Sequence, residues 1–111
     1  MYHFIKIGGV GEMVRVIHLC QAHGIEVTPH SPYFGPGFVA TIHIAAALVE
    51  HPMIEVLWLD IEANPFDPWV RAIDGQVRIP DGPGLGCDPD PDILKRFAKG
   101  ATTRIEARPK P

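Results

Sequence analysis

The stretch that decides the fold class is residues 25–59, IEVTPHSPYFGPGFVATIHIAAALVEHPMIEVLWL. Its first four residues are a mostly β-branched run, residues 38–50 are rich in alanine and apolar on most faces, and residues 54–59 are a second apolar run. Gly35-Pro36-Gly37 stands where a helix would begin, and Pro52 stands where it would end. A helix between two short apolar runs is typical of parallel strands joined by a crossover helix.

The same alternation extends toward the N-terminus. Residues 4–7, FIKI, are predicted to form a short strand that stops at Gly8-Gly9. From Val10 to Cys20 the apolar residues recur at helical spacing, and Gly24 follows as a glycine C-cap would. The predicted order is therefore β-α-β-α-β with short connections, which indicates an α/β fold.

The character of the sequence changes after residue 60, where turn-forming pairs such as Asn-Pro, Asp-Pro and Asp-Gly become frequent. Residues 75–80 fit a short strand, and Asp90 can cap a last helix with Pro91 at its first position. We expect the tail from residue 102 to 111 to be frayed. The chain thus divides into residues 1–60 and a turn-rich segment, residues 61–111.

Composition excludes several classes of protein. A chain of 111 residues with a 46% hydrophobic fraction has the size and composition of one globular unit. The mild formal charge of -3, without an evident basic cluster, gives no indication of a nucleic-acid partner. The longest apolar run, residues 42–49, is far shorter than the roughly 20 residues that span a bilayer, so no membrane partner is expected. The N-terminus lacks a secretory layout, and the expected location is the cytoplasm.

Three residues lie at or near the C-terminal ends of predicted strands, where parallel βα folds carry their catalytic and ligand-binding residues. Lys6 is near the end of the first predicted strand, His30 follows the second, and Glu55 lies in the third. An imidazole can exchange a proton near neutral pH, and the alternative is that His30 is a loop residue that hydrogen-bonds a carbonyl. Glu55 is an isolated carboxyl group in an apolar strand, either a hydrogen-bond donor in a pocket or a helix partner at the strand edge.

The other candidate residues have simpler interpretations. His18, His23, His43 and His51 include no pair at metal-ligand spacing and are predicted to be surface or helix-end residues. Residues 82–86, GPGLG, are interpreted as a turn, because no strand leads directly into a helix there. The two cysteines, Cys20 and Cys87, are far apart in the sequence, and we interpret each as a small buried apolar residue.

Three segments occur in one order: residues 6–10, KIGGV; residues 28–31, TPHS; and residues 79–86, IPDGPGLG. Together they resemble the end of a member of the mandelate racemase and muconate lactonizing enzyme family, within the enolase superfamily. The resemblance covers nearly the whole chain. It implies a modified (β/α) barrel with a capping domain, and Mg²⁺-dependent removal of a proton next to the carboxylate of a hydroxy acid or sugar acid. Racemisation, cycloisomerisation or dehydration would follow.

On this resemblance, residues 1–60 correspond to the last three βα units of the barrel, and residues 61–111 to a segment that packs on the capping domain. His30 matches the histidine base after the seventh strand. Glu55 matches the eighth-strand glutamate that hydrogen-bonds the developing enediolate. Lys6 and His3 are possible supporting residues at the strand ends.

The chain departs from the family pattern in two respects. The family pairs its histidine with an aspartate, and His3 occupies that position here. The magnesium ligands and the second-strand lysine of the family also fall outside this chain.

Three strands alone leave two open edges, which invite pairing with other chains. We therefore expect a truncated product, a piece that assembles with a partner chain, or a self-associating remnant. The alternatives in function are an enzyme segment, a catalytically silent interaction module, and a small independent α/β binding domain.

Overall fold

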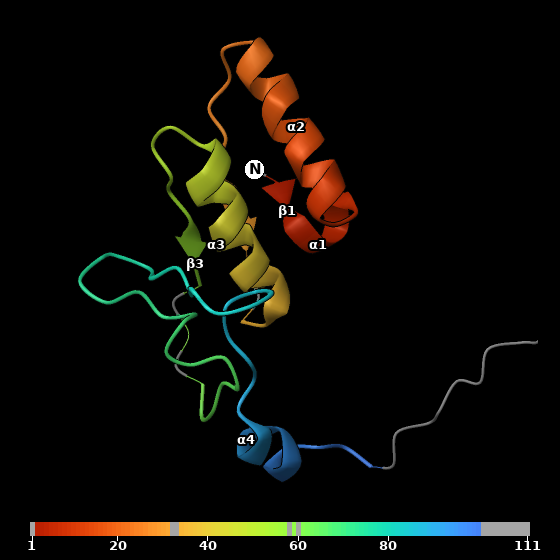
Figure 1. Ribbon diagram of the computed structural model, residues 1–111, viewed down its shortest axis with the longest axis vertical. Helices are drawn as coiled ribbons and strands as arrows, with labels where there is room; N and C mark the ends of the chain where they lie inside the picture. Colours follow the sequence, from red (N-terminus) through yellow and green to blue (C-terminus); the bar gives the residue numbers. More distant parts are fainter. Residues whose placement is uncertain (1, 32–33, 58, 60, 101–111) are drawn as a thin grey trace, which may run out of the picture.

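The computed structural model describes residues 2–31, 34–57, 59 and 61–100 (Figure 1). Three strands in this part of the chain form one parallel sheet in the order β1-β2-β3. Helices connect each strand to the next, which confirms the predicted α/β class. The elements, in chain order, are β1 (Tyr2–His3), α1 (Phe4–Ile7), α2 (Val10–Ala22), β2 (Pro29–Ser31), α3 (Pro36–Leu48), β3 (Glu55–Val56) and α4 (Pro91–Arg96).

The first strand is not where the sequence pattern placed it. The predicted strand at residues 4–7 is the short helix α1, and β1 is the two residues before it. Lys6 therefore lies exposed on α1, beyond the strand. Periodicity cannot distinguish a strand from a helix in so short an apolar run. Gly8 and Gly9, both at positive φ (112° and 94°), then allow the chain to turn into α2.

Helix α2 confirms the prediction for this segment. Of the residues that the apolar spacing selected, Met13, Ile17 and Cys20 are buried and Val14 is half-buried. The helix ends at Ala22, and Gly24 adopts a φ of 65°, the left-handed conformation expected after a helix C-terminus. The Gly24 amide donates to the Gln21 carbonyl at 3.0 Å, which satisfies one of the terminal acceptors.

The second and third strands are also displaced or shortened. The predicted strand at residues 25–28 begins instead at Pro29, so His30 lies within β2 rather than after it. Proline has no N–H to donate, but at the first position of a strand this loses no ladder bond. The third strand is only Glu55–Val56, within the predicted 54–59. Trp58 and Asp60 lie outside the described residues.

Helix α3 is the centre of the fold, with α2 and β3 on opposite sides of it in Figure 1. Gly35 is its N-cap and Pro36 its first residue, so the helix begins and ends two residues earlier than the predicted residues 38–50. It contributes to two apolar clusters, in agreement with a helix that is apolar on most faces. The first cluster is Met13, Ile17, Cys20, Val27 and Ile44. The second is Phe38, Val39, Ile42, Phe66 and Val70.

The segment after β3 is rich in turns, but the predicted strand at residues 75–80 is wrong. An isolated antiparallel bridge joins Ile73 and Gln76 around Asp74 and Gly75, both at positive φ. Among the described residues, no strand pairs with residues 77–80. An extended run there therefore has no neighbouring strand with which to form a sheet.

Helix α4 begins as predicted, with Asp90 as its cap. The Asp90 carboxylate accepts hydrogen bonds from the amides of Asp92 (2.8 Å) and Ile93 (3.1 Å). An ion pair between Arg96 and Glu62 (2.9 Å) ties the helix to the preceding segment. The predicted frayed tail, residues 102–111, lies outside the described residues. Among the residues that are described, no helix is long and apolar enough to cross a membrane.

Candidate active site

His30 and Glu55 are brought together by the strand register. They occupy paired positions on the neighbouring parallel strands β2 and β3. Paired positions on adjacent strands direct their side chains to the same face of a sheet. The Nδ1 atom of His30 contacts the Oε2 atom of Glu55. With side-chain exposures of 20% and 40%, the pair is partly covered and partly accessible to solvent.

His3 continues the same row across the third strand. Its backbone pairs with His30 in the β1–β2 register, and its side chain lies outside the described part of the chain. The position that the family resemblance assigns to an aspartate is therefore adjacent to His30. Lys6 does not belong to this row, because it lies on α1, three residues past His3.

The contact at Nδ1 determines which imidazole nitrogen is available for chemistry. An ionised carboxylate can only accept a hydrogen bond, so a neutral His30 bonded to Glu55 carries its proton on Nδ1. The lone pair then lies on Nε2, which becomes the basic atom. A protonated His30 would instead form an ion pair with the same carboxylate. The arrangement can thus accept a proton at Nε2 and hold the resulting charge.

The described residues do not fit a magnesium site. They contain no group of three or more His, Cys, Asp and Glu side chains positioned to hold a metal ion. Magnesium prefers octahedral oxygen coordination and is usually held by one or two carboxylates with water and substrate. Glu55 is the carboxylate in the row, and one of its oxygens already contacts His30. The chemistry that these residues can supply is therefore proton transfer by the His30–Glu55 pair.

One histidine has a structural contact that sequence spacing missed. His43, predicted to be a surface or helix-end residue, is half-buried, and its Nε2 lies 2.9 Å from the carbonyl oxygen of Leu85. His18, His23 and His51 are exposed, as predicted. No local pattern reveals the His43 contact, because its partner is 42 residues away in the sequence.

The glycine-rich segment at residues 82–86 is a turn, as predicted. The Gly86 amide donates to the Pro83 carbonyl at 3.0 Å, and the Gly82 amide donates to the Gly86 carbonyl at 3.2 Å. Both cysteines are free thiols. Cys20 is buried and Cys87 is half-buried. Burial, and to a lesser degree the Asp88 carboxylate, raises the pKa of the Cys87 thiol.

Comparison with known proteins decides the family. The family model described as enolase C-terminal domain-like matches residues 2–93. This chain belongs to that family. The match confirms the resemblance to the mandelate racemase and muconate lactonizing enzymes of the enolase superfamily.

Several characterised relatives are similar to this enolase-superfamily chain. It is 34% identical over 100 residues to D-galactarolactone cycloisomerase of Agrobacterium fabrum, covering 81% of the chain and 26% of the relative. Chloromuconate cycloisomerase of Pseudomonas putida is 33% identical over 104 residues, or 85% and 26% of the two chains. Arabinonate dehydratase of Saccharolobus solfataricus is 31% identical over 81 residues, or 71% and 21%. The chain therefore spans about a quarter of the length of these relatives. No solved structure matches it.

Proposed function

We propose that this chain supplies proton-transfer groups for an enolase-superfamily reaction, removal of the proton next to the carboxylate of a hydroxy acid or sugar acid. The observation that carries the proposal is the contact between His30 and Glu55 on neighbouring strands. A histidine next to a carboxylate on a neighbouring strand is suited to general acid–base chemistry. The relatives are named as cycloisomerases and a dehydratase, which agrees with this class of chemistry.

Each residue of the pair has a separate role in the proposal. His30 takes or returns the proton on one face of the α-carbon through Nε2, the nitrogen that does not contact Glu55. Glu55 orients the imidazole through Oε2. Its other oxygen, when protonated, donates a hydrogen bond to the substrate carboxylate. His3 is a possible supporting residue beside His30, whereas Lys6 is left out because it lies on α1.

The wider architecture is part of the same proposal. Residues 1–60 would form the last three βα units of a (β/α) barrel, and residues 61–111 would pack on a capping domain. Magnesium is the cofactor that the family implies, and its ligands would come from outside the described residues. We propose that the 111-residue chain is inactive alone, acts in the cytoplasm, and needs the remaining strands from a partner or a fusion.

The experiment that tests this function is a chimera. The matching quarter of the Agrobacterium fabrum D-galactarolactone cycloisomerase is replaced by residues 2–93 of this chain. Exchange of the α-proton of a panel of hydroxy acids and sugar acids is followed by NMR in D₂O with Mg²⁺. Exchange above that of a no-enzyme control supports the proposal. A folded chimera that exchanges no substrate, beside an active parent enzyme, contradicts it.

A second candidate function is a catalytically silent interaction module. In the described sheet, β1 and β3 each pair with β2 alone, so each leaves one edge open. Large apolar side chains such as Leu57 and Leu59 are also exposed beside β3. Open edges and exposed apolar residues favour association with another chain. Sedimentation velocity over a concentration series tests it: a compact monomer at all concentrations would reject self-association.

A further inference from the structure

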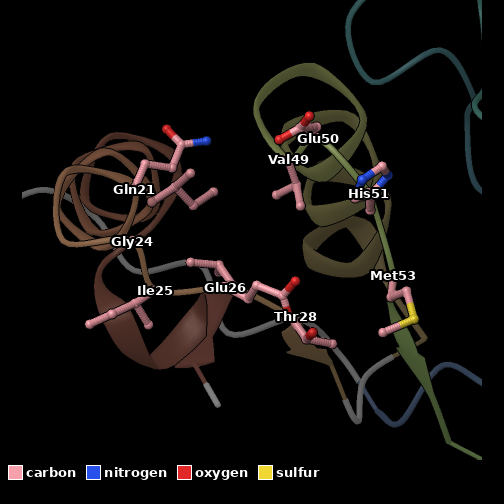
Figure 2. Close-up of a pocket in the computed structure, with 11 residues that line it drawn as sticks. Gln21, Gly24, Ile25, Glu26, Thr28, Val49, Glu50, His51 and Met53 are labelled. Carbon is pink, nitrogen blue, oxygen red and sulfur yellow. The ribbon is translucent and has the colours of Figure 1, made fainter.

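A groove lies between the C-terminal ends of α2 and α3, with residues 25–28 running beneath it (Figure 2). Its volume is about 470 Å³. Gln21 projects from the α2 side and Glu50 from the α3 side, and Glu26 lies below them. The groove also has an apolar lining that includes Ile17, Ile25, Val27, Val49 and Met53. It is therefore a mixed surface of apolar and polar side chains.

The charge around this groove is negative. Glu26 and Glu50 are both exposed there, and no described lining residue is Lys or Arg. The C-terminal end of a helix carries a partial negative charge that favours cations. Two such ends meet at the groove, and neither α2 nor α3 has a basic residue in its last turn. The groove thus favours an occupant that combines cationic groups with apolar stems, which Lys and Arg side chains provide.

The chain itself contains a segment of this chemistry. Residues 93–111 hold six of its ten Lys and Arg residues and one of its thirteen Asp and Glu residues, a formal charge of +5. Residues 1–92 hold the other four basic and twelve acidic residues, a formal charge of −8. The expectation that the chain has no basic cluster was therefore wrong, because the mild net charge conceals this division. Such asymmetry is typical of a basic segment with an acidic partner.

The geometry favours binding of the basic segment to the groove of a second copy over binding to the groove of its own chain. The basic segment begins in α4, which the Arg96–Glu62 ion pair holds at the opposite end of Figure 1 from the end of α2. Eleven residues follow Gly100. Fully extended, they would reach at most about 40 Å. The fold measures 48 Å along its longest axis, so a segment that reached its own groove would leave few residues to lie along it.

We propose that the groove between α2 and α3 binds the basic segment, residues 93–111, of a second copy of this chain. Lys and Arg side chains of the segment pair with Glu26 and Glu50, and their stems cover the apolar lining. Reciprocal exchange of the two segments would close a dimer. This inference does not depend on the proposed catalytic function, because it uses none of the residues of the His30 row.

The test is binding of a fluorescent peptide with the sequence of residues 98–111, AKGATTRIEARPKP, to the full chain. Fluorescence anisotropy at low salt gives the Kd. The variant Glu26→Gln/Glu50→Gln removes both groove carboxylates. The matched control Asp74→Asn/Asp81→Asn makes the same change of charge at exposed positions outside the groove. We expect the groove variant to raise Kd about threefold to tenfold, the scale of two surface ion pairs, and the control to leave it within about twofold.

Three outcomes would overturn the proposal. One is the absence of binding at millimolar peptide, and another is equal weakening by the groove and control variants, which would indicate attraction by net charge alone. The third concerns the source of the segment. At a dilution where sedimentation shows a monomer, deletion of residues 101–111 should not change the Kd of the peptide. A lower Kd after deletion would mean that each chain fills its own groove.

Discussion

His30 on β2 and Glu55 on β3 are register partners in a parallel sheet, and the Nδ1 atom of His30 contacts the Oε2 atom of Glu55. The contact joins two residues that are 25 positions apart in the sequence. It also leaves Nε2 as the imidazole nitrogen that can accept a proton. The proposed chemistry depends on this orientation.

The first prediction concerns the imidazole tautomer. In the wild-type chain, neutral His30 should carry its proton mainly on Nδ1, because the Glu55 carboxylate accepts from that atom. Glu55→Gln should lower the Nδ1–H fraction. The Gln amide has an NH₂ group that can donate to an unprotonated Nδ1, whereas the carboxylate can only accept from a protonated one. Nitrogen-15 chemical shifts of the imidazole report the fraction directly. Glu50→Gln, in the distant groove, serves as the control, and equal tautomer ratios in all three proteins would contradict the assigned contact.

A second prediction is that the purified 111-residue chain does not turn over hydroxy acids or sugar acids in the presence of Mg²⁺. The described residues lack a cluster of three metal-ligating side chains, and one carboxylate does not hold a catalytic magnesium firmly. Product formation is measured by NMR with a substrate panel, and the parent relative is the positive control. Turnover by a homogeneous sample that a chelator abolishes would show the prediction to be wrong.

The third prediction concerns the turn at residues 82–86. A Cβ atom added at Gly86 would lie 2.6 Å from the Pro80 carbonyl carbon, and the residue has a φ of 83°. Gly86→Ala should therefore destabilise the fold by at least about 3 kcal/mol, through both backbone strain and the close contact. Gly84→Ala is the matched control: its φ is 67° and no atom lies within 4 Å, so strain alone should cost about 1 kcal/mol. Urea unfolding measures both values, and equal losses would contradict the close approach.

Helices were predictable from the sequence to a much greater extent than strands. Apolar spacing and caps located α2, and Gly35-Pro36 and Asp90-Pro91 located the starts of α3 and α4, because these signals are local. The strands are two or three residues long, which is too short for a period of two to be visible. Where their ladders begin depends on the neighbouring strands.

The candidate site was predicted in part. His30 and Glu55 could be selected because each follows or lies in an apolar run near a predicted strand end. The contact between their side chains could not be predicted, because it follows from the register of β2 and β3. Lys6 was misplaced because the run around it is helical. The His43 contact with Leu85 joins segments that no sequence pattern relates.

A fourth prediction uses the position beside His30 in the sheet. His3 pairs with His30 in the backbone register, so a carboxylate introduced there would stand in the same row of the sheet. His3→Asp in the chimera should increase α-proton exchange, because a carboxylate in this row would stabilise the imidazolium that forms when His30 takes the proton. His3→Asn provides a control of similar size without the charge. A rate that is unchanged by His3→Asp would mean that the side chain of residue 3 does not reach His30.

The most direct test of the central claim is the effect of His30→Ala on α-proton exchange in the chimera, measured by NMR in D₂O. A positioned acid or base usually contributes about 10²–10⁴-fold to rate, so exchange should fall by that factor while circular dichroism shows an intact fold. His18→Ala, at an exposed position on α2, should leave the rate unchanged. If His30→Ala exchanges the α-proton as fast as the unmutated chimera, His30 is not the base, and the proposed role of the His30–Glu55 pair is wrong.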